Sequence, residues 1–360
     1  MEKHRILVIN PGSTSTKIAV YDDEQQIFTQ NIIHDGEELR EKFADIFDQY
    51  EYRKELIFVV LADKGVAIET INIVMAIGGL LPPVPAGAIE VSEDMCLLLK
   101  NHPRNKHASN LGAPIALSIA QPLGIKAYVY DPITVDQLDP IARISGIKEI
   151  TRTGLGHALN MRACAMKYAR EKGRDYSDMK LIVAHLGGGV TLSCHSGGRM
   201  VEMVSDEDGP FSGTRTGGLP LFEAISLFSK KEMTYDMAMK EVKDNGGLMS
   251  YLGVSDTREV EKMINGGNAY AALIYEAMAY QVARCIGSLA PVVDCKPDAI
   301  ILTGGIAYSG RFPQMVEKRV AALAPVVIMA GEFEMEALAK GGLRVLRGDE
   351  QPSRFIRAIE

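Results

Sequence analysis

The chain contains two similar segments about half its length apart, and this internal repeat constrains the fold more than any other feature. Residues 7–16 have the sequence LVINPGSTST, and residues 182–191 have the sequence IVAHLGGGVT. Three pairs of residues align without a gap: Asn10 with His185, Gly12 with Gly187, and Thr16 with Thr191. Each segment predicts a buried strand, a turn of small residues and a second strand, followed by a polar turn and a third extended run. The repeat therefore predicts two related domains, one in each half of the chain.

The two turns have the composition of anion-binding backbone. Glycine and other small residues let backbone N–H groups approach a ligand closely, and the concave loops that result bind anions. The first turn carries four consecutive hydroxyl side chains, residues 13–16, between Asn10 and Lys17. A ligand-free hairpin is the alternative, but it does not need so many donors. The GxxxxGK[ST] spacing of a P-loop is absent, and a strand rather than a helix follows the turn. We expect a polyphosphate in a cleft between the domains.

Composition excludes several classes of function. The 360 residues are enough for two domains with cores of their own. A net charge of −7, with no run of Lys or Arg longer than a pair, argues against a nucleic-acid partner. No stretch approaches the roughly 18 apolar residues of a membrane span, and the N-terminal residues show no secretory signal. The five cysteines and seven histidines are scattered, which is typical of a cytoplasmic protein without a zinc site.

The alternation of strand and helix patterns predicts an α/β protein. In the first half we expect strands at 5–10, 15–22, 26–33, 71–77 and 126–130, and helices at 36–50 and 108–121. In the second half we expect three strands within 180–204, helices across 221–289, strands at 299–302 and 326–329, and a final helix from near 334. The expected domains are 1–148, joined by a C-terminal helix at about 337–360, and 149–336.

Five motifs carry a resemblance to a known family. They are INPGSTSTK (9–17), HASNLGA (107–113), DGPFSGTRTGG (208–218), YLGVSDTREV (251–260) and ILTGG (301–305). In this order and over essentially the whole chain, they resemble the acetate kinase family of the acetate and sugar kinase, Hsp70 and actin superfamily. Within that family the motifs are most similar to those of the butyrate kinases. A lone Gly-Gly after a strand is weak evidence, since any strand-to-helix turn can use it.

The resemblance implies a fold and an activity. The fold would be two duplicated ribonuclease-H-like domains, each a mixed sheet with flanking helices, around a nucleotide cleft. The reaction would be transfer of the γ-phosphoryl group of ATP to butanoate, giving butanoyl phosphate and ADP, with Mg²⁺ and in either direction. In-line attack by the carboxylate leaves the protein the tasks of positioning and charge neutralisation. The resemblance also implies a homodimer or larger assembly.

The resemblance assigns roles to individual residues. The implied catalytic residues are Asp131, His157, His185 and Arg215, and the implied metal site is Asn10, Asp131 and Glu334. The implied nucleotide contacts are Asn10, Ser13, Thr14, Ser15, Thr16, Lys17, Gly187, Gly188, Gly189, Asp256, Arg258, Gly304 and Gly305. Without the resemblance, Asp131 in Asp-Pro indicates only a turn, and His185 only a buried structural histidine.

The chain departs from the family pattern around the expected acyl site. Ile77 stands where the family usually has an arginine that pairs with the carboxylate or acyl phosphate, a contact isoleucine cannot make. Gly213-Thr214 replaces the usual Pro-Glu, and residues 153–156 replace Lys-Ser-Ile-Phe. Three hypotheses follow. Another cation, such as Arg143 or Arg152, compensates; or the acid is a different one, such as propanoate, isobutyrate or a longer chain; or kinase activity is weakened in a nucleotide-binding relative.

Overall fold

The computed structural model describes residues 3–101 and 107–356, and the chain forms two compact units. Unit 1 comprises Met1–Asp136 and Phe333–Glu360, and unit 2 comprises Gln137–Glu332. The chain therefore passes from unit 1 to unit 2 near residue 136, whereas the sequence predicts this boundary at 148. The reason is that the segment after 136 bonds to unit 2: Asp139 donates its N–H to Val201 O at 3.0 Å, and Arg152 pairs with Glu202 at 3.0 Å.

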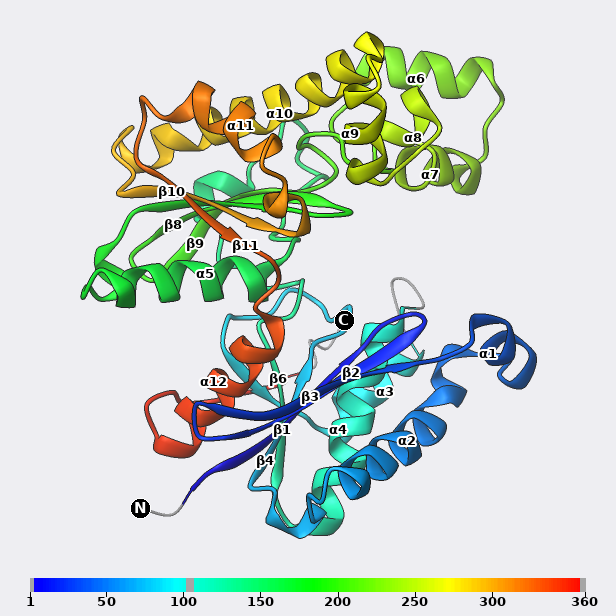
Figure 1. Ribbon diagram of the computed structural model, residues 1–360, viewed down its shortest axis with the longest axis vertical. Coiled ribbons are helices and arrows are strands. Elements are labelled where there is room, and N and C mark those ends of the chain that lie inside the picture. Colours follow the sequence, from blue (N-terminus) through cyan, green and yellow to red (C-terminus); the bar gives the residue numbers. More distant parts are fainter. Residues whose placement is uncertain (1–2, 102–106, 357–360) are drawn as a thin grey trace. The chain divides into compact units, whose positions relative to one another are not determined.

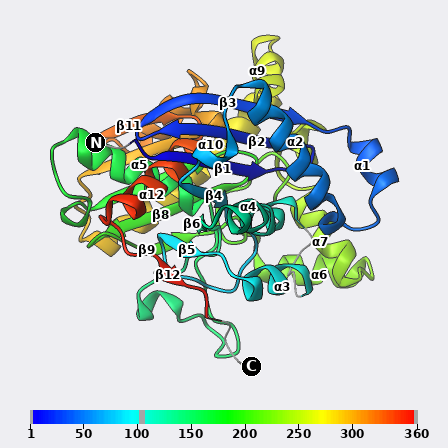
Figure 2. The ribbon, with the colours of Figure 1, turned by 90° about the horizontal axis from the view of Figure 1, so that it is seen from below.

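Unit 1 contains a seven-stranded mixed sheet with the order β12-β5-β6-β4-β1-β2-β3. The strands are β1 (Arg5–Pro11), β2 (Ser15–Asp22), β3 (Gln25–Ile33), β4 (Ile73–Ile77), β5 (Ala88–Glu90), β6 (Lys126–Tyr130) and β12 (Ser353–Arg354). The helices are α1 (Gly36–Lys42), α2 (Tyr50–Asp63), α3 (Glu93–Asn101), α4 (Gly112–Ala120) and α12 (Glu334–Arg347). Helices α2 and α4 cover one face of the sheet and α12 covers the other (Figures 1 and 2). This explains why β1 and β4 are apolar almost throughout: both of their faces are buried.

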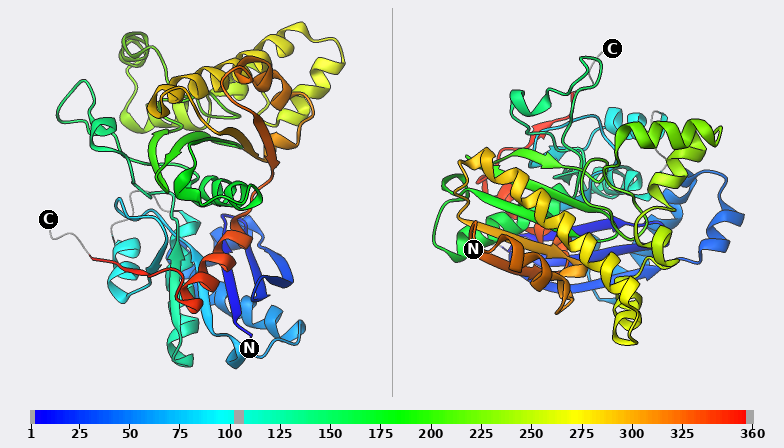
Figure 3. Two further views of the ribbon diagram at one scale, coloured as in Figure 1. Left: turned by 90° about the vertical axis from the view of Figure 1, so that its left-hand side faces the viewer. Right: turned by 90° about the horizontal axis from the view of Figure 1, so that it is seen from above.

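Unit 2 contains a five-stranded mixed sheet with the order β11-β10-β7-β8-β9. The strands are β7 (Leu181–Leu186), β8 (Val190–Ser196), β9 (Arg199–Val204), β10 (Ala299–Gly304) and β11 (Val326–Ala330). The helices are α5 (Ala158–Glu171), α6 (Leu221–Lys230), α7 (Tyr235–Lys243), α8 (Gly247–Leu252), α9 (Thr257–Asn265), α10 (Ala269–Leu289) and α11 (Phe312–Val320). The long α10 lies across one face of this sheet and α5 lies on the other (Figures 1 and 3).

The two sheets share one topology, as the repeat predicts. In each, an antiparallel meander of three strands is extended by two parallel strands, so that β6-β4-β1-β2-β3 corresponds to β11-β10-β7-β8-β9. The gapless alignment, however, fails at the turn. Four residues lie between the paired Pro11 and Thr16, but only three lie between the paired Leu186 and Val190. A one-residue change in an antiparallel turn shifts the pairing of every residue after it.

The helix expected at 36–50 is divided into two. Asp35 caps α1 by accepting the N–H groups of Glu37 and Glu38, but the helix ends at Lys42 because Phe43 is extended. A single 3₁₀ turn, Ile46–Gln49, then leads directly into α2. The division matters because it places α2 behind the first glycine turn of the repeat.

Candidate functional site

The first turn of the repeat presents an exposed and a buried side. The turn joins β1 to β2, and Ser13 and Thr14 at its tip are exposed, as is Lys17 on β2. Thr16 is fully buried, and its Oγ1 lies 2.8 Å from Nε2 of His34. Of the four hydroxyl groups expected to contact phosphate, that of Thr16 is therefore on the interior side of the turn.

A buried arginine that sequence analysis did not identify lies behind this turn. Arg53 on α2 has no exposed surface. Its guanidinium donates to the carbonyl oxygens of Gly12 at 2.8 Å, Ser13 at 3.2 Å and Ser15 at 3.0 Å. It also donates to Thr16 Oγ1 at 3.1 Å. In sequence, Arg53 is one charged residue among several on a helix, and nothing distinguishes it from a solvent-exposed arginine.

The carboxyl ends of the parallel strands in unit 1 carry the expected metal residues. Strand β4 pairs with β1 (Ile9 opposite Ala76) and with β6 (Ile77 opposite Tyr130). Asn10, Ile77 and Asp131 therefore lie at the same edge of the sheet, where ligands of open α/β sheets bind.

Two of these expected ligands are brought together from opposite ends of the chain. Asn10 Nδ2 donates to Oε2 of Glu334, the first residue of α12, at 2.7 Å.

Asp131 occupies an unusual backbone position. Its φ is +41°, in the left-handed region that few non-glycine residues adopt. The side chain is almost wholly buried, and its Oδ1 accepts the N–H of Gly87 at 2.6 Å. The sequence suggested a simple turn at Asp-Pro, whereas the structure shows a fixed, buried carboxylate. Such local strain is maintained only where the surrounding structure enforces it.

In unit 2, the two expected catalytic histidines form a stacked pair. The rings of His157 and His185 are 3.8 Å apart between centroids and inclined by only 5°. His157 Nδ1 lies 2.9 Å from Oγ1 of Thr191, and His185 Nδ1 lies 3.0 Å from Nδ2 of Asn160. Asn160 also donates to Thr303 Oγ1 at 3.1 Å. The internal repeat identifies Thr191 in the sequence, but nothing in the sequence analysis identified Asn160.

Burial keeps both rings neutral. It lowers the pKa of His157 to about 4, with the nearby Arg215 guanidinium contributing in the same direction and Asp206 opposing. Burial likewise lowers the pKa of His185 well below its ordinary value, assisted by His157. A charge on either stacked ring would be desolvated and would face a second cation-forming group. At neutral pH the pair therefore provides hydrogen bonds rather than charge.

The glycines of the second turn make room for these groups. A Cβ at Gly187 would lie 2.9 Å from Nε2 of His185, and one at Gly189 would collide with Arg215. The same Cβ at Gly189 would lie 3.4 Å from Cε1 of His157. Gly187 and Gly189 therefore let two histidines and an arginine converge on one stretch of backbone, whereas Gly188 faces open space.

Arg215 is already paired in this structure. Its Nη1 forms an ion pair with Oδ2 of Asp206, a residue in the same polar loop between β9 and α6. Sequence reasoning identified Arg215 and missed Asp206, because an acidic residue in a polar loop is usually solvated.

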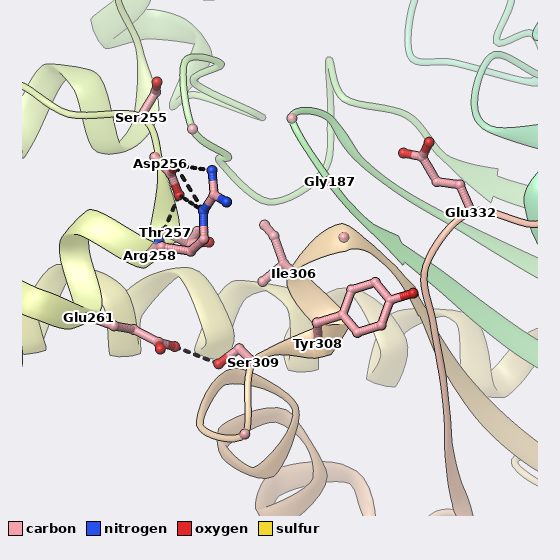
Figure 4. Close-up of a pocket in the computed structure, with 14 residues that line it drawn as sticks. Gly187, Ser255, Asp256, Thr257, Arg258, Glu261, Ile306, Tyr308, Ser309 and Glu332 are labelled. Carbon is pink, nitrogen blue, oxygen red and sulfur yellow. Dashed lines mark hydrogen bonds and ion pairs between the residues drawn. The ribbon is translucent and has the colours of Figure 1, made fainter. Parts of the chain in front are cut away.

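A cavity of about 670 Å³ lies within unit 2 beside the second turn. Figure 4 shows that Asp256 and Arg258 lie on one side of it, while Ile306 and Tyr308, from the segment after β10, lie on another. The lining also includes the expected nucleotide residues Gly187, Gly188 and Gly305, together with Glu261, Ser309 and Glu332.

Asp256 also has a local structural role. It caps α9 by accepting the N–H of Arg258 at 2.8 Å. The hydrogen bonds from Arg258 lower the pKa of Asp256 to about 2. Gly304 does not line the cavity, but its φ of +89° and its approach to the Leu186 carbonyl require glycine.

The comparisons with known proteins agree with this geometry. The model of the acetokinase family matches residues 146–351, more than half of the chain. The chain belongs to the acetokinase family. It is 44% identical over 354 residues to butyrate kinase 1 of Clostridium acetobutylicum, covering 98% of this chain and 99% of that protein. Butyrate kinase 2 of the same organism is also 44% identical, over 355 residues and with the same coverage.

Solved structures of acetokinase-family proteins share the fold. The crystal structure of Porphyromonas gingivalis acetate kinase matches with a TM-score of 0.78, covering 95% of this chain and all of that one, at 17% identity. The duplicated α/β architecture expected from the repeat is thereby confirmed.

Two further observations complete the description of this acetokinase-family chain. Within residues 3–101 and 107–356, no cluster of three or more His, Cys, Asp or Glu side chains is arranged to hold a metal ion by itself. Over the same residues, no helix combines the length and the apolar character needed to cross a membrane.

Proposed function

We propose that this protein is a carboxylate kinase that transfers the γ-phosphoryl group of ATP to butanoate and forms butanoyl phosphate and ADP. The observation that carries the proposal is the 44% identity to two butyrate kinases over 98% of the chain. The convergence of neutral histidines, an arginine and a glycine turn in unit 2 supports a site for a transferring phosphoryl group. The reaction forms one P–O bond to the carboxylate as the bond to ADP breaks, so no covalent enzyme intermediate is needed.

In unit 1, we assign Asn10, Asp131 and Glu334 to the magnesium and acceptor side. Their oxygens are the hard ligands that Mg²⁺ prefers, and Mg²⁺ usually uses one or two carboxylates together with substrate phosphates. The small number of carboxylates at this edge and the fixed position of Asp131 fit that pattern. When bound, the metal neutralises phosphate charge. Ser13, Thr14, Ser15 and Lys17 would then contact the phosphoryl group, with Thr16 held beneath them.

In unit 2, we assign to Arg215 and the histidine pair the role of stabilising the negative charge that develops on the equatorial oxygens of the transferring phosphoryl group. Arg215 can exchange Asp206 for the phosphoryl group, since both partners are anions. A neutral His157 that accepts from Thr191 through Nδ1 carries its proton on Nε2 and can donate it as a hydrogen bond. His185 has the same arrangement with Asn160. The cavity lined by Asp256, Arg258 and Gly305 would hold the nucleoside.

The absence of an arginine at position 77 does not exclude this assignment. Of the two candidate replacements, Arg152 is already bound to β9. It donates to Met203 O at 2.9 Å and pairs with Glu202 at 3.0 Å. Asp131 and Glu334 both lie in the unit that carries Ile77, so the bound metal is the natural counter-ion for the acceptor carboxylate.

We also propose that the protein functions in the cytoplasm as a homodimer or larger assembly. The five cysteines are all free, which is typical of a reducing compartment. Helix α6 and its flanks expose an apolar surface, with Leu221, Phe222 and Ile225 each more than half exposed. Surfaces of this kind are usually covered by another protein chain.

The test is an ATP-dependent assay that traps acyl phosphate with hydroxylamine. Acetate through hexanoate and the branched short acids are compared on the wild type and on Ile77→Arg. We expect the highest kcat/KM with butanoate. A higher value with another acid would reassign the substrate, and no turnover with any acid despite ATP binding would exclude the kinase. Rescue by Ile77→Arg would then place the defect at that residue.

A further inference from the structure

The first turn of the repeat is held by contacts that no motif predicts. Five N–H groups of one guanidinium are available, and in Arg53 both terminal nitrogens are directed at the turn. The remaining contacts go to Gln49, whose Oε1 accepts from Nε at 3.2 Å and from Nη2 at 2.9 Å. Gln49 is in the 3₁₀ turn that precedes α2, so the guanidinium is fixed at both ends.

The positions of the accepting carbonyls determine where the turn's N–H groups point. A trans peptide is planar, so the C=O of one residue and the N–H of the next point in opposite directions. The carbonyls of Gly12 and Ser13 point at Arg53. The N–H groups of Ser13 and Thr14 must therefore point away from it, toward the exposed side of the turn. Neither N–H has a hydrogen-bond partner among the residues that the structure describes. Adjacent outward N–H groups of this kind bind anions.

The positive charge of Arg53 also favours an anion on the exposed side of the turn. The hydrogen bonds of its guanidinium to the described residues go to carbonyl, amide and hydroxyl oxygens, which are all neutral. Burial lowers its pKa to about 10, so the group stays protonated at neutral pH. His34, the other group behind Thr16, is neutral because burial lowers its pKa to about 4. A buried cation in contact only with neutral dipoles favours an anion on the far side of those dipoles.

We propose that Arg53 is a positioning residue for phosphoryl transfer: it turns the N–H groups of Ser13 and Thr14 toward the phosphoryl group and supplies positive potential from behind. The inference rests on the proposed function, because it extends the phosphate site of that reaction. Arg53 does not touch substrate. Arg53 acts on the site only through the peptide groups of Gly12, Ser13 and Ser15, whose carbonyls it binds. Because Arg53 lies outside the sequence of the turn, the motif does not include it.

The experiment compares Arg53→Lys with Lys54→Gln in the full-length protein. Arg53→Lys keeps the charge but has three N–H donors in place of five, so it cannot keep the three carbonyls, Thr16 and Gln49 bound at once. Lys54→Gln removes a charge from the next position of the same helix. All assays are run well below the melting temperature of each variant. We expect kcat to fall about 10- to 100-fold in Arg53→Lys, less than the roughly 100- to 1000-fold that loss of an oxyanion donor costs, because the N–H groups are displaced and not removed. The Kd for ADP, which binds in unit 2, should not change, and Lys54→Gln should behave as the wild type.

Three results would overturn the proposal. They are a kcat of Arg53→Lys within about twofold of the wild type, an equal loss in Lys54→Gln, and a loss of ADP affinity in proportion to kcat, which would indicate general damage to the fold. If Arg53→Lys does not fold, Gln49→Ala takes its place, since it frees one end of the guanidinium without removing it. The same split between kcat and ADP affinity is then expected, and its absence counts against the proposal.

A binding measurement separates this inference from the proposed function. Inorganic phosphate should raise the melting temperature of the wild type more than that of Arg53→Lys or Gln49→Ala, whether or not any acid is turned over. Equal shifts in all three proteins would overturn the positioning role. A wild type that turns over no acid but shows the expected difference in shifts would keep the positioning role and exclude only the kinase.

Discussion

At the scale of the residue, the site is governed by which groups are kept neutral and which are kept charged. The stacked His157 and His185 cannot both be charged, and burial ensures that neither is at neutral pH. In the proposed reaction, charge neutralisation therefore falls to Arg215, which is held by Asp206 in this structure. Removing Arg215 should therefore lower turnover, whereas removing Asp206 should tighten nucleotide binding and leave turnover nearly unchanged.

Replacing Arg215 by Met should lower kcat by about three decades, since arginines that stabilise phosphoryl transfer contribute 10³ to 10⁵. Arg199→Met is the matched control, because Arg199 also pairs with an aspartate, Asp139, but on the exposed end of β9. Steady-state kinetics of both variants with ATP and butanoate measure the difference. A loss below tenfold in Arg215→Met would contradict the assigned role.

Replacing Asp206 by Asn should lower the KM for ATP about two- to fivefold, because the nucleotide no longer competes with an internal carboxylate. The partly exposed pair contributes at most about 1 kcal/mol, which sets the size of the effect. The kcat should stay within about twofold. If kcat instead falls tenfold, Asp206 orients Arg215 rather than competing for it.

At the scale of the element, the last turn of α12 and the segment that follows it support the strand edge that carries Asp131. Glu350 accepts hydrogen bonds from Ala88 N–H at 2.9 Å, Tyr130 Oη at 2.8 Å and Arg344 Nε at 3.0 Å. Burial alone would favour the protonated carboxyl, but these bonds reverse the effect and lower the pKa of Glu350. The neighbouring Gly87 donates to Asp131, so a residue near the C-terminus helps to fix the expected acceptor side.

The change Glu350→Ala should reduce the free energy of unfolding by about 2–4 kcal/mol, because Arg344 and the Ala88 N–H lose a common acceptor in a half-buried position. Asp349→Ala, one residue earlier and exposed, is the control and should change stability by less than about 0.5 kcal/mol. Urea unfolding followed by circular dichroism measures both. Equal effects would show that the Glu350 network contributes nothing specific.

At the scale of the whole molecule, we expect neutral histidines with lowered pKa values to limit stability in acid. Burial lowers the pKa of His34 and His157 to about 4 and that of His195 to about 3. In the unfolded chain these groups bind protons near pH 6.5, which the folded protein cannot do until the pH is much lower. Their stabilising effect is therefore complete above about pH 6.5 and is lost as the pH falls from there toward 4.

The urea midpoint should accordingly fall steeply between pH 6.5 and 4, and less steeply in His195→Gln. His195 is fully buried between Tyr176 and Ser193, 2.7 Å from each hydroxyl oxygen, and lies outside the expected site. The comparison between the two slopes matters more than the midpoints themselves, because the substitution also changes packing. Parallel slopes for the two proteins would contradict the histidine origin of acid unfolding.

The apolar surface on α6 predicts the mass in solution. Light scattering should give twice the 39.2 kDa of the chain or a higher multiple. Phe222 has 85% of its surface exposed, so Phe222→Glu should shift the protein toward the monomer if a second copy covers that helix. Tyr235→Glu tests the adjacent α7 in the same way. A monomeric wild type would contradict the proposed assembly.

The sequence determined the elements that depend on local pattern. Strands β2 and β6 were located to the residue, because each contains a continuous buried run, Ile18–Tyr21 and Ala127–Tyr130, and polar residues mark where the strand begins. The glycine turns and the His, Asp and Arg residues expected in the site were identifiable because they stand in motifs. The helix at 36–50 was wrong in extent, since apolar spacing does not report that Phe43 becomes extended.

Only the tertiary structure decided which side chains meet. Asn10 contacts Glu334, 324 positions away in the chain, and Arg53 binds a turn some 40 positions before it. The roles of Asp206 and Asn160 can likewise be inferred only from their contacts with Arg215 and His185. The local sequence around a polar residue does not show whether its side chain is solvated or buried against a functional group. Local sequence fixes backbone propensity, whereas the partners of buried polar groups are fixed by the packing of distant elements.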